Sequence, residues 1–193
     1  DNAYDQYWEG YWPSGGGTDR TAAGNDGTAN GGVSVGGVAG NLGDATDFDG
    51  GDDYVAVGAL DSDYNIASAS GHTIIAWVNS DEASGTVEDA IGSGAGEGDV
   101  ILQVDGNGNA KAHFHDGNGL QVVSYNGAAL SSGTWGQIAQ MWDGDDLYAF
   151  LNGSSASTTC NGTPSESTNT ISIGARGTSS TRANAQIQHA QIH

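Results

Sequence analysis

Clustered carboxylates are the side chains in this chain best suited to binding a metal ion. Asp49, Asp52 and Asp53 lie within five positions of one another, and calcium prefers several oxygen ligands supplied by one loop. The sequence therefore predicts a candidate calcium site at these three residues. A second acidic turn spans 143–146, and neither turn has the spacing of an EF-hand. A hydrated acidic turn without a metal is the alternative.

Histidines with strand spacing form a second candidate site. Lys111, His113 and His115 alternate along one predicted strand, so their side chains point to the same side. Two imidazoles can bind a transition metal or a sugar hydroxyl. Because these residues form the least acidic patch of the chain, we predict that an acidic glycan or partner binds there. The alternative is the solvated side of a half-buried strand.

Aromatic residues are concentrated near the N-terminus, where five occur between positions 4 and 12. Exposed aromatic rings stack on sugars, and Trp and Tyr anchor protein interfaces. We therefore predict ligand contacts at Trp8, Tyr11 and Trp12. A segment that caps the fold and a contact to a neighbouring domain or subunit are the other interpretations.

Two sequons, at Asn152 and Asn161, match the pattern for glycosylation and fall in predicted loops. If they are used, they place the protein outside the cell.

The sequence gives little support to a catalytic site. Retaining glycosidases need two carboxyl groups about 5.5 Å apart, whereas Glu88 and Asp89 are adjacent on a predicted strand and would point to opposite sides. We therefore expect the chain not to be an enzyme.

The charge balance excludes several partner classes. Four Lys and Arg against 24 Asp and Glu give a net charge of −20, so nucleic acid and anionic lipid should be repelled. No apolar run reaches the roughly 18 residues of a membrane span. Cys160 is the single cysteine.

The acidic composition is typical of proteins from halophiles, because molar salt would screen the repulsion among carboxylates. An acidic extracellular module rich in calcium is the alternative.

Short alternating runs between Gly, Asn and Asp turns predict an all-β chain. None of the runs has a helical period, which favours an antiparallel β-sandwich. The eleven predicted strands span 45–48, 54–57, 73–79, 89–91, 100–104, 111–115, 120–125, 135–142, 147–151, 170–174 and 186–192.

Several sequence blocks resemble one family in the same order. Residues 47–55 read Asp-Phe-Asp-Gly-Gly-Asp-Asp-Tyr-Val and are similar to the "FDG-x-DDYV" motif of laminin G-like domains in the concanavalin A-like lectin/glucanase superfamily. The resemblance implies a jelly roll of about a dozen strands over residues 11–193, preceded by an aromatic segment or linker at 1–10. The other similar blocks lie at 11–13, 24–28, 73–78, 130–135, 143–153, 171–176 and 187–193.

The resemblance also implies roles for single residues. Trp77 and Trp135 match positions that pack the core of the family's sandwich. Gln188 occupies the position of an Asp that often binds calcium in relatives, so a calcium site there would be weakened or lost.

For function, the resemblance implies a non-enzymatic, extracellular recognition or adhesion module that binds a glycan or a surface protein in a halophilic system. A structural subunit of a virion, such as a spike, decoration or tail component, or of a cell-surface filament is the alternative. That alternative would add other subunits of the assembly as partners. A glycosidase is the third hypothesis.

Overall fold

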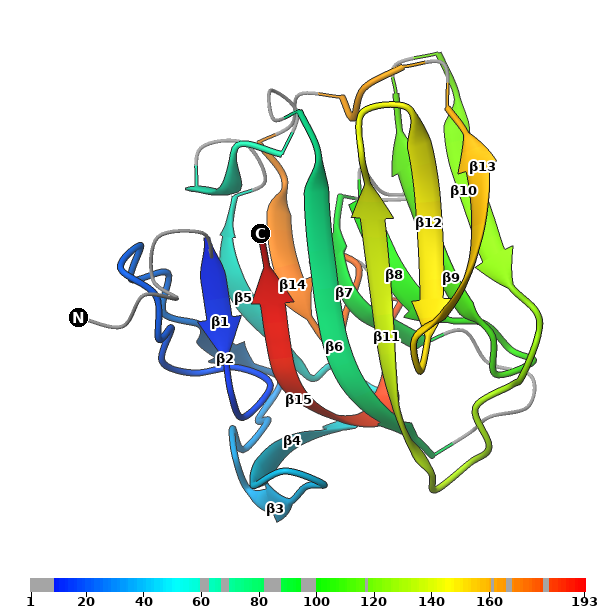
Figure 1. The fold of residues 1–193 in the computed structure, drawn as a ribbon. Helices are drawn as coiled ribbons and strands as arrows, with labels where there is room; N and C mark the ends of the chain where they lie inside the picture. The colour runs from blue at the N-terminus through cyan, green and yellow to red at the C-terminus, as the bar shows by residue number, and fades with distance from the viewer. Residues whose placement is uncertain are drawn as a thin grey trace.

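The computed structural model describes residues 9–59, 63–66, 70–81, 88–94, 100–116, 118–160, 162–165, 168–178 and 181–193. Within these residues the chain forms two antiparallel sheets packed face to face (Figure 1). The predicted all-β antiparallel jelly-roll sandwich is therefore confirmed. The strands are β1 (Gly10–Trp12), β2 (Thr28–Asn30), β3 (Val38–Ala39), β4 (Asp44–Asp49), β5 (Tyr54–Ala59), β6 (His72–Ser80), β7 (Glu88–Ser93), β8 (Val100–Val104), β9 (Ala110–His115), β10 (Leu120–Tyr125), β11 (Trp135–Trp142), β12 (Asp146–Leu151), β13 (Ser154–Thr159), β14 (Thr170–Ile173) and β15 (Asn184–Ile192).

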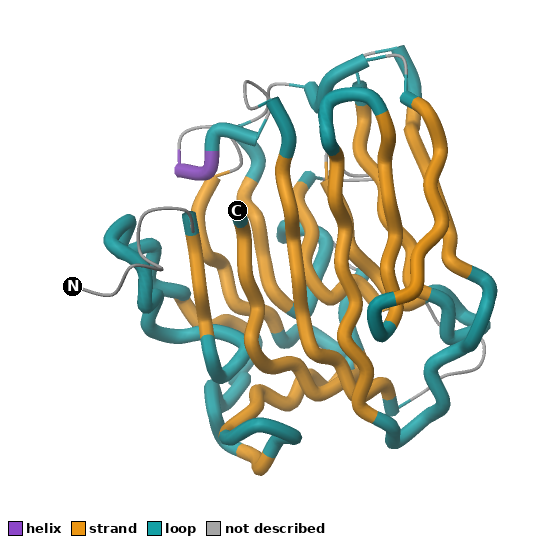
Figure 2. Tube along the Cα trace, viewed as in Figure 1, coloured by secondary structure: helices purple, strands orange, loops and turns teal. Residues whose placement is uncertain are grey.

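The two sheets differ in how their strands are ordered. The eight-stranded sheet has the order β13-β12-β11-β6-β15-β4-β3, and β1 pairs with the C-terminal part of β15. The seven-stranded sheet has the order β10-β9-β8-β7-β14-β5-β2. Loops and one short helical turn at 63–64 connect the strands at the ends of the sandwich (Figure 2). No helix in the described part of the chain is long and apolar enough to cross a bilayer.

The core lies between the sheets and is built from alternate residues of each strand. In β6, Ile74, Ala76 and Val78 are at most 1% exposed, and their neighbours are half-buried. This period of two is the expected pattern for a strand with one side in the core. Small residues supply much of the packing, and the largest buried rings belong to Trp12, Phe48, Phe114 and Trp142.

The core assignment of two tryptophans was wrong. Trp77 and Trp135 are half-buried and alternate with core residues of β6 and β11, so their rings face outward from the eight-stranded sheet. The period of two decides this placement, because Ala76 and Val78 already occupy the inner side of β6. The error has a physical cause: β6 is apolar on both sides, and such a run does not reveal which side is buried.

All eleven predicted strands are present, and four further strands were missed. β1, β2 and β3 are only two or three residues long. β13 is a Ser- and Thr-rich strand at the edge of its sheet, and its pattern of burial has no fully buried side. Each of these strands lacks the hydrophobic alternation on which a sequence-based prediction depends.

Candidate functional site

The outer side of the seven-stranded sheet is covered around its central strands. The outward residues Ile101 of β8 and His113 of β9 are 0% and 3% exposed. After β14, Gly174 adopts a φ of +79° and the chain turns back over the sheet. Gly177 then donates its N–H to the carbonyl of Gly92 (3.0 Å), and Arg176 lies in a bridge with Gly92. We call this outer side the covered face.

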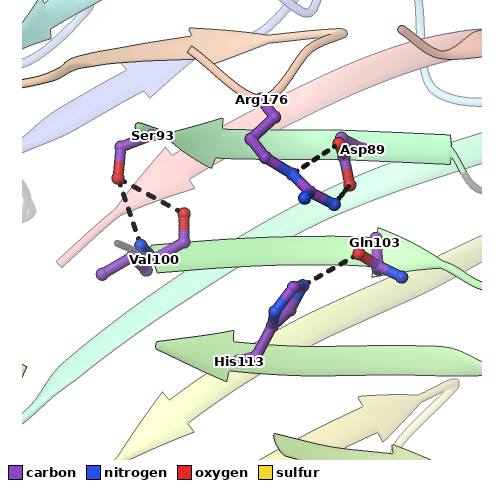
Figure 3. Close-up of polar contacts among 6 residues, drawn as sticks. All are labelled: Asp89, Ser93, Val100, Gln103, His113 and Arg176. Carbon is purple, nitrogen blue, oxygen red and sulfur yellow. Dashed lines mark hydrogen bonds and ion pairs between the residues drawn. The ribbon is translucent and has the colours of Figure 1, made fainter. Parts of the chain in front are cut away.

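An ion pair holds the covering segment to the sheet. Arg176 Nε lies 3.2 Å from Asp89 Oδ2, and Nη2 lies 3.4 Å from Oδ1 (Figure 3). Asp89 is completely buried, and the side chain of Arg176 is 14% exposed. Burial raises the pKa of Asp89 to about 6, although the Arg176 guanidinium acts in the opposite direction. The pair is therefore enclosed, where a charge without its partner would be costly.

The predicted row of Lys111, His113 and His115 falls on this covered face. His113 donates from Nε2 to the side-chain carbonyl of Gln103 (2.8 Å), and Gln103 is itself 2% exposed (Figure 3). Burial, followed by the charges of Lys111 and Arg176, lowers the pKa of His113 to about 3. The placement of His113 as a ligand contact therefore needs correction, because its ring is neutral and enclosed. Lys111 and His115 are half-buried.

Arg176 and Arg182, two of the four Lys and Arg residues, are engaged within the protein. Arg176 pairs with Asp89, and the guanidinium of Arg182 lies 4.7 Å from the centre of the Tyr54 ring. Arg20 is exposed in the loop after β1. No Lys or Arg in the described part of the chain belongs to an outward position of β6, β11, β12 or β15.

The acidic turn between β4 and β5 brings three predicted ligands together. One carboxylate oxygen from each of Asp49, Asp52 and Asp53 lies within 4.8 Å of the others. Asp53 is 8% exposed, and its pKa is raised first by burial and then by the charge of Asp49. Three oxygens at this spacing supply part of the six to eight that calcium takes. The residues therefore fit a divalent cation completed by backbone oxygens or water.

The side chain of Gln188 binds the backbone of a neighbouring loop. Its side chain is fully buried, and Oε1 accepts the N–H groups of Asn41 (2.7 Å) and Leu42 (3.3 Å). These bonds hold the loop between β3 and β4 against β15. The carbonyl is already satisfied by backbone donors, so a cation site at this position has no support.

The aromatic residues near the N-terminus separate into two environments. Trp12 is 0% exposed and donates its indole N–H to the carbonyl of Asn25 (3.0 Å). Its prediction as a ligand contact is therefore contradicted, since β1 belongs to the sandwich and turns this ring into the core. Tyr11 points the other way, stacks on His189 with ring centres 5.8 Å apart, and bonds its hydroxyl to Nδ1 (2.7 Å). Trp8 lies outside the described residues.

Of the two predicted glycosylation sites, the structure describes the one at Asn152. Asn152 is exposed in the turn between β12 and β13, and its side-chain carbonyl accepts the N–H of Gln137 (2.9 Å). Asn161 lies outside the described residues.

The two adjacent acids, Glu88 and Asp89, are 1% and 0% exposed. Neither of these two carboxyl groups is on the surface, where a substrate would meet it.

On the outer side of the eight-stranded sheet most outward side chains are half-buried, although Gln188 is fully buried against the loop between β3 and β4. Thirteen uncharged, half-buried residues on this side include five with aromatic rings and four with side-chain amides. We call this surface the open face. It consists of Tyr11 of β1, Thr73, Ile75, Trp77 and Asn79 of β6, Trp135, Gln137, Ala139 and Met141 of β11, Tyr148 and Phe150 of β12, and Gln186 and Gln191 of β15.

Strand register joins the middle of the open face into one row that crosses five strands. Phe150 lies opposite Ala139, and Ala139 lies opposite Ile75 on its other side. Ile75 lies opposite Gln191, which in turn lies opposite Tyr11. We call these five residues the central row. Sequence reasoning placed only Tyr11 in a binding role, although the alternation within each strand held the signal for the others.

The chemistry of the open face suits a polyhydroxylated ligand. Aromatic rings offer flat apolar faces, and side-chain amides both donate and accept hydrogen bonds. Acidic residues make up 24 of 193 positions, yet in the described part of the chain they meet this surface at its margins, at Asp146 at the start of β12, at Asp143, which accepts the hydroxyl of Tyr148 (3.2 Å), and at Asp47 of β4. Rings that stay half-buried on the outer side of a sheet, rather than in the core, make this surface a candidate interaction site.

A model of the laminin G type, described as the concanavalin A-like lectin/glucanases superfamily, matches residues 49–193. Among curated proteins no sequence matches the chain.

Solved structures with the same fold have low sequence identity to this chain. The receptor-binding domain of botulinum neurotoxin mosaic serotype C/D is 15% identical with a TM-score of 0.71, over 96% of this chain and 46% of that one. Domain 4 of AbnA, an extracellular GH43 arabinanase from Geobacillus stearothermophilus in complex with arabinotriose, is 13% identical with a TM-score of 0.71, over 96% and 91%. The ligand-binding domain of botulinum neurotoxin serotype D in complex with N-acetylneuraminic acid is 12% identical with a TM-score of 0.68, over 96% and 47%. The chain thus spans about half the length of the toxin structures.

Proposed function

Because the chain belongs to the concanavalin A-like lectin/glucanases superfamily, we propose that it is a non-catalytic module that recognises a glycan through its open face. The module would act outside the cell, in surroundings of high salt that suit a net charge of −20. A partner with a sugar surface would be a polysaccharide or a glycosylated surface protein.

One observation carries the proposal, namely the combination of rings and amides on an uncharged sheet surface. Trp77 and Gln137 lie directly opposite each other in the paired strands β6 and β11. A sugar stacked on the indole ring would therefore have an amide beside it for its hydroxyl groups. Strands are also rigid supports, so these side chains are positioned before a ligand arrives, which lowers the entropic cost of binding.

Two of the similar structures support the choice of a glycan. One is a domain of an arabinanase with bound arabinotriose, and another is a toxin domain with bound N-acetylneuraminic acid. The buried positions of Glu88 and Asp89 support a role without catalysis. The open face replaces the row around Lys111 as the favoured site, because His113 in the middle of that row is 3% exposed and bonded to Gln103.

The proposal is tested with a matched pair of charge substitutions on the two outer faces. Ile75 lies in the centre of the open face, and Val122 is the exposed outward residue of β10 on the other sheet. Glycans that bind the wild type in a screen at molar salt are titrated by calorimetry. We expect Ile75→Asp to abolish binding and Val122→Asp to leave it unchanged, with both variants folded by circular dichroism. Equal binding by both variants would overturn the open face as the site.

A subunit of a larger assembly is the second candidate function, and specific residues favour it. Ile75, Met141 and Phe150 are aliphatic or aromatic and half-buried on one surface, as expected for the core of a protein interface. Sedimentation at molar salt separates the two functions. A dimer or larger oligomer that Ile75→Asp converts to a monomer would favour the assembly, whereas a monomeric wild type that binds glycans would favour recognition.

A further inference from the structure

We infer that the open face takes an uncharged, linear glycan that lies across the strands along the central row and occupies about four sugar positions. This inference rests on the proposed function and adds the charge, the direction and the length of the ligand. It depends on three features of the open face, which are the ends of the central row, the spacing of its strands and the distribution of charge around it.

Both ends of the central row carry aromatic rings that are held by a stacked neighbour. At one end Phe150 stacks on Tyr148, with ring centres 6.0 Å apart and an interplanar angle of 22°. At the other end Tyr11 stacks on His189 at 5.8 Å and 21°, and its hydroxyl is bonded to the same ring. Each pair fixes the orientation of its terminal ring, so stacking on a sugar costs little side-chain entropy.

Two aliphatic side chains, Ala139 and Ile75, form the middle of the central row. Ala139 has the smallest side chain of the open face, and it lies between Gln137 and Met141 along β11. Ile75 lies between Thr73 and Trp77 along β6. A glycan that follows the row therefore contacts aliphatic side chains and has the Gln137 amide and the Trp77 indole along one side. A chain that followed β11 instead would have to cross Met141 and would reach neither terminal ring.

The length of the ligand follows from sheet geometry. The central row crosses β12, β11, β6, β15 and β1, which are successive neighbours in the sheet. Four intervals of about 4.8 Å give a row about 19 Å long, which matches about four linked hexoses. Sugars beyond this length would extend past Tyr11 or Phe150 and would add no contact with the row.

The charge of the ligand follows from what surrounds the row. Asp146 and Asp47 lie at the margins of the open face, and the described cations lie elsewhere, with Arg176 paired to Asp89. A carboxylate or sulfate on the glycan would meet negative charge without a partner. An uncharged glycan has no such penalty, and its hydroxyl groups can pair with Gln137 and Gln191.

The experiment measures affinity for neutral oligosaccharides of two to six sugars, taken from a polysaccharide that binds the wild type. We expect affinity to rise at least tenfold from the disaccharide to the tetrasaccharide and then to stay level. The matched uronic acid tetrasaccharide should bind at least tenfold more weakly in 0.1 M salt than the neutral one. Tyr11→Ala should make the trisaccharide and tetrasaccharide bind equally. Tyr11→Phe keeps the ring and should keep most of the difference.

Distinct results separate the failure of this inference from that of the proposed function. Affinity that levels off at the disaccharide, that keeps rising beyond six sugars, or that favours the acidic tetrasaccharide would overturn the inference while glycan binding itself stands. Binding that is lost in Val122→Asp and kept in Ile75→Asp would overturn both. A folded protein that binds no glycan at all would also overturn both.

Discussion

Arg176 and Asp89 join two segments that are 87 residues apart in sequence, and their ion pair is enclosed on the covered face. Removing one partner of a buried pair leaves an uncompensated charge. We therefore expect Arg176→Met to lower the free energy of unfolding at neutral pH, as measured by urea denaturation, by about 1–2 kcal/mol, because a carboxyl with a pKa of about 6 can take up a proton instead of staying charged.

Asp89→Asn in the Arg176→Met background is the matched control, because it removes the orphaned charge and should restore much of the loss. The loss in Arg176→Met should also shrink at pH 5, since loss of the guanidinium raises the pKa of Asp89 above its present value of about 6 and the carboxyl becomes neutral. A single variant as stable as the wild type would contradict the enclosed pair.

Buried histidines predict a loss of stability in mild acid. Burial lowers the pKa of His113 to about 3 and that of His72 to about 4. Both rings are neutral in the folded protein, whereas in the unfolded chain they take up protons near pH 6.5. Their stabilising contribution is therefore complete above pH 6.5 and is lost as the pH falls toward 4.

Asp89 opposes this trend, because its raised pKa makes the folded state take up one proton between pH 6 and 4. Two histidines against one carboxyl leave a net loss of about 1.4 kcal/mol for each pH unit in that window. Chemical denaturation from pH 7 to pH 4 measures it. His113→Gln should reduce the slope, because it removes one of the two buried rings. A stability that stays flat over the window would refute the assignment of neutral rings.

Salt should stabilise the fold because of its net charge of −20. The Debye length shortens from about 10 Å at 0.1 M salt to about 3 Å at 1 M, so repulsion among carboxylates weakens. We expect the melting temperature to rise by about 4–8 °C over that range, which corresponds to about 2 kcal/mol for a chain of this size. Circular dichroism melts in potassium chloride test this, and an unchanged or lower melting temperature at 1 M would count against adaptation to salt.

The acidic turn predicts a response to calcium that depends on Asp53. Burial raises the pKa of this carboxyl, and the charges of Asp49 and Asp52 act in the same direction. Without calcium, Asp53→Asn should raise the melting temperature, because it removes repulsion in the turn. Millimolar calcium should stabilise the wild type and have no effect on the variant. Equal responses of the two proteins to calcium would exclude a site at this turn.

The strands and the fold class could be predicted because their signals are local. Residues 100–104, 120–125 and 135–142 are short runs rich in apolar residues and bounded by Gly, Asn and Asp turns, and the structure has strands with those bounds. β13 could not be predicted, because this edge strand of Ser and Thr has no side buried in the core and therefore no hydrophobic alternation.

The candidate site could not be predicted to the same extent, because it depends on which side of a strand is buried. Trp77 and Trp12 are both tryptophans in strands, but one faces outward and the other lies in the core. That choice is made by the packing of the second sheet and by the register of β1 on β15. The burial of His113 beside Gln103 is likewise a tertiary feature that spacing does not reveal.

The most direct test of the central claim is an NMR titration of the indole N–H and side-chain amide signals with a neutral tetrasaccharide at molar salt. Trp77 and Trp135 lie on the open face, whereas Trp12 and Trp142 are at most 2% exposed in the core and serve as internal controls. The account predicts that the signals of Trp77 and of the Gln137 amide shift on binding, and that those of Trp12, Trp142 and the Gln103 amide stay in place. Shifts confined to Gln103 and its neighbours on the covered face would contradict it.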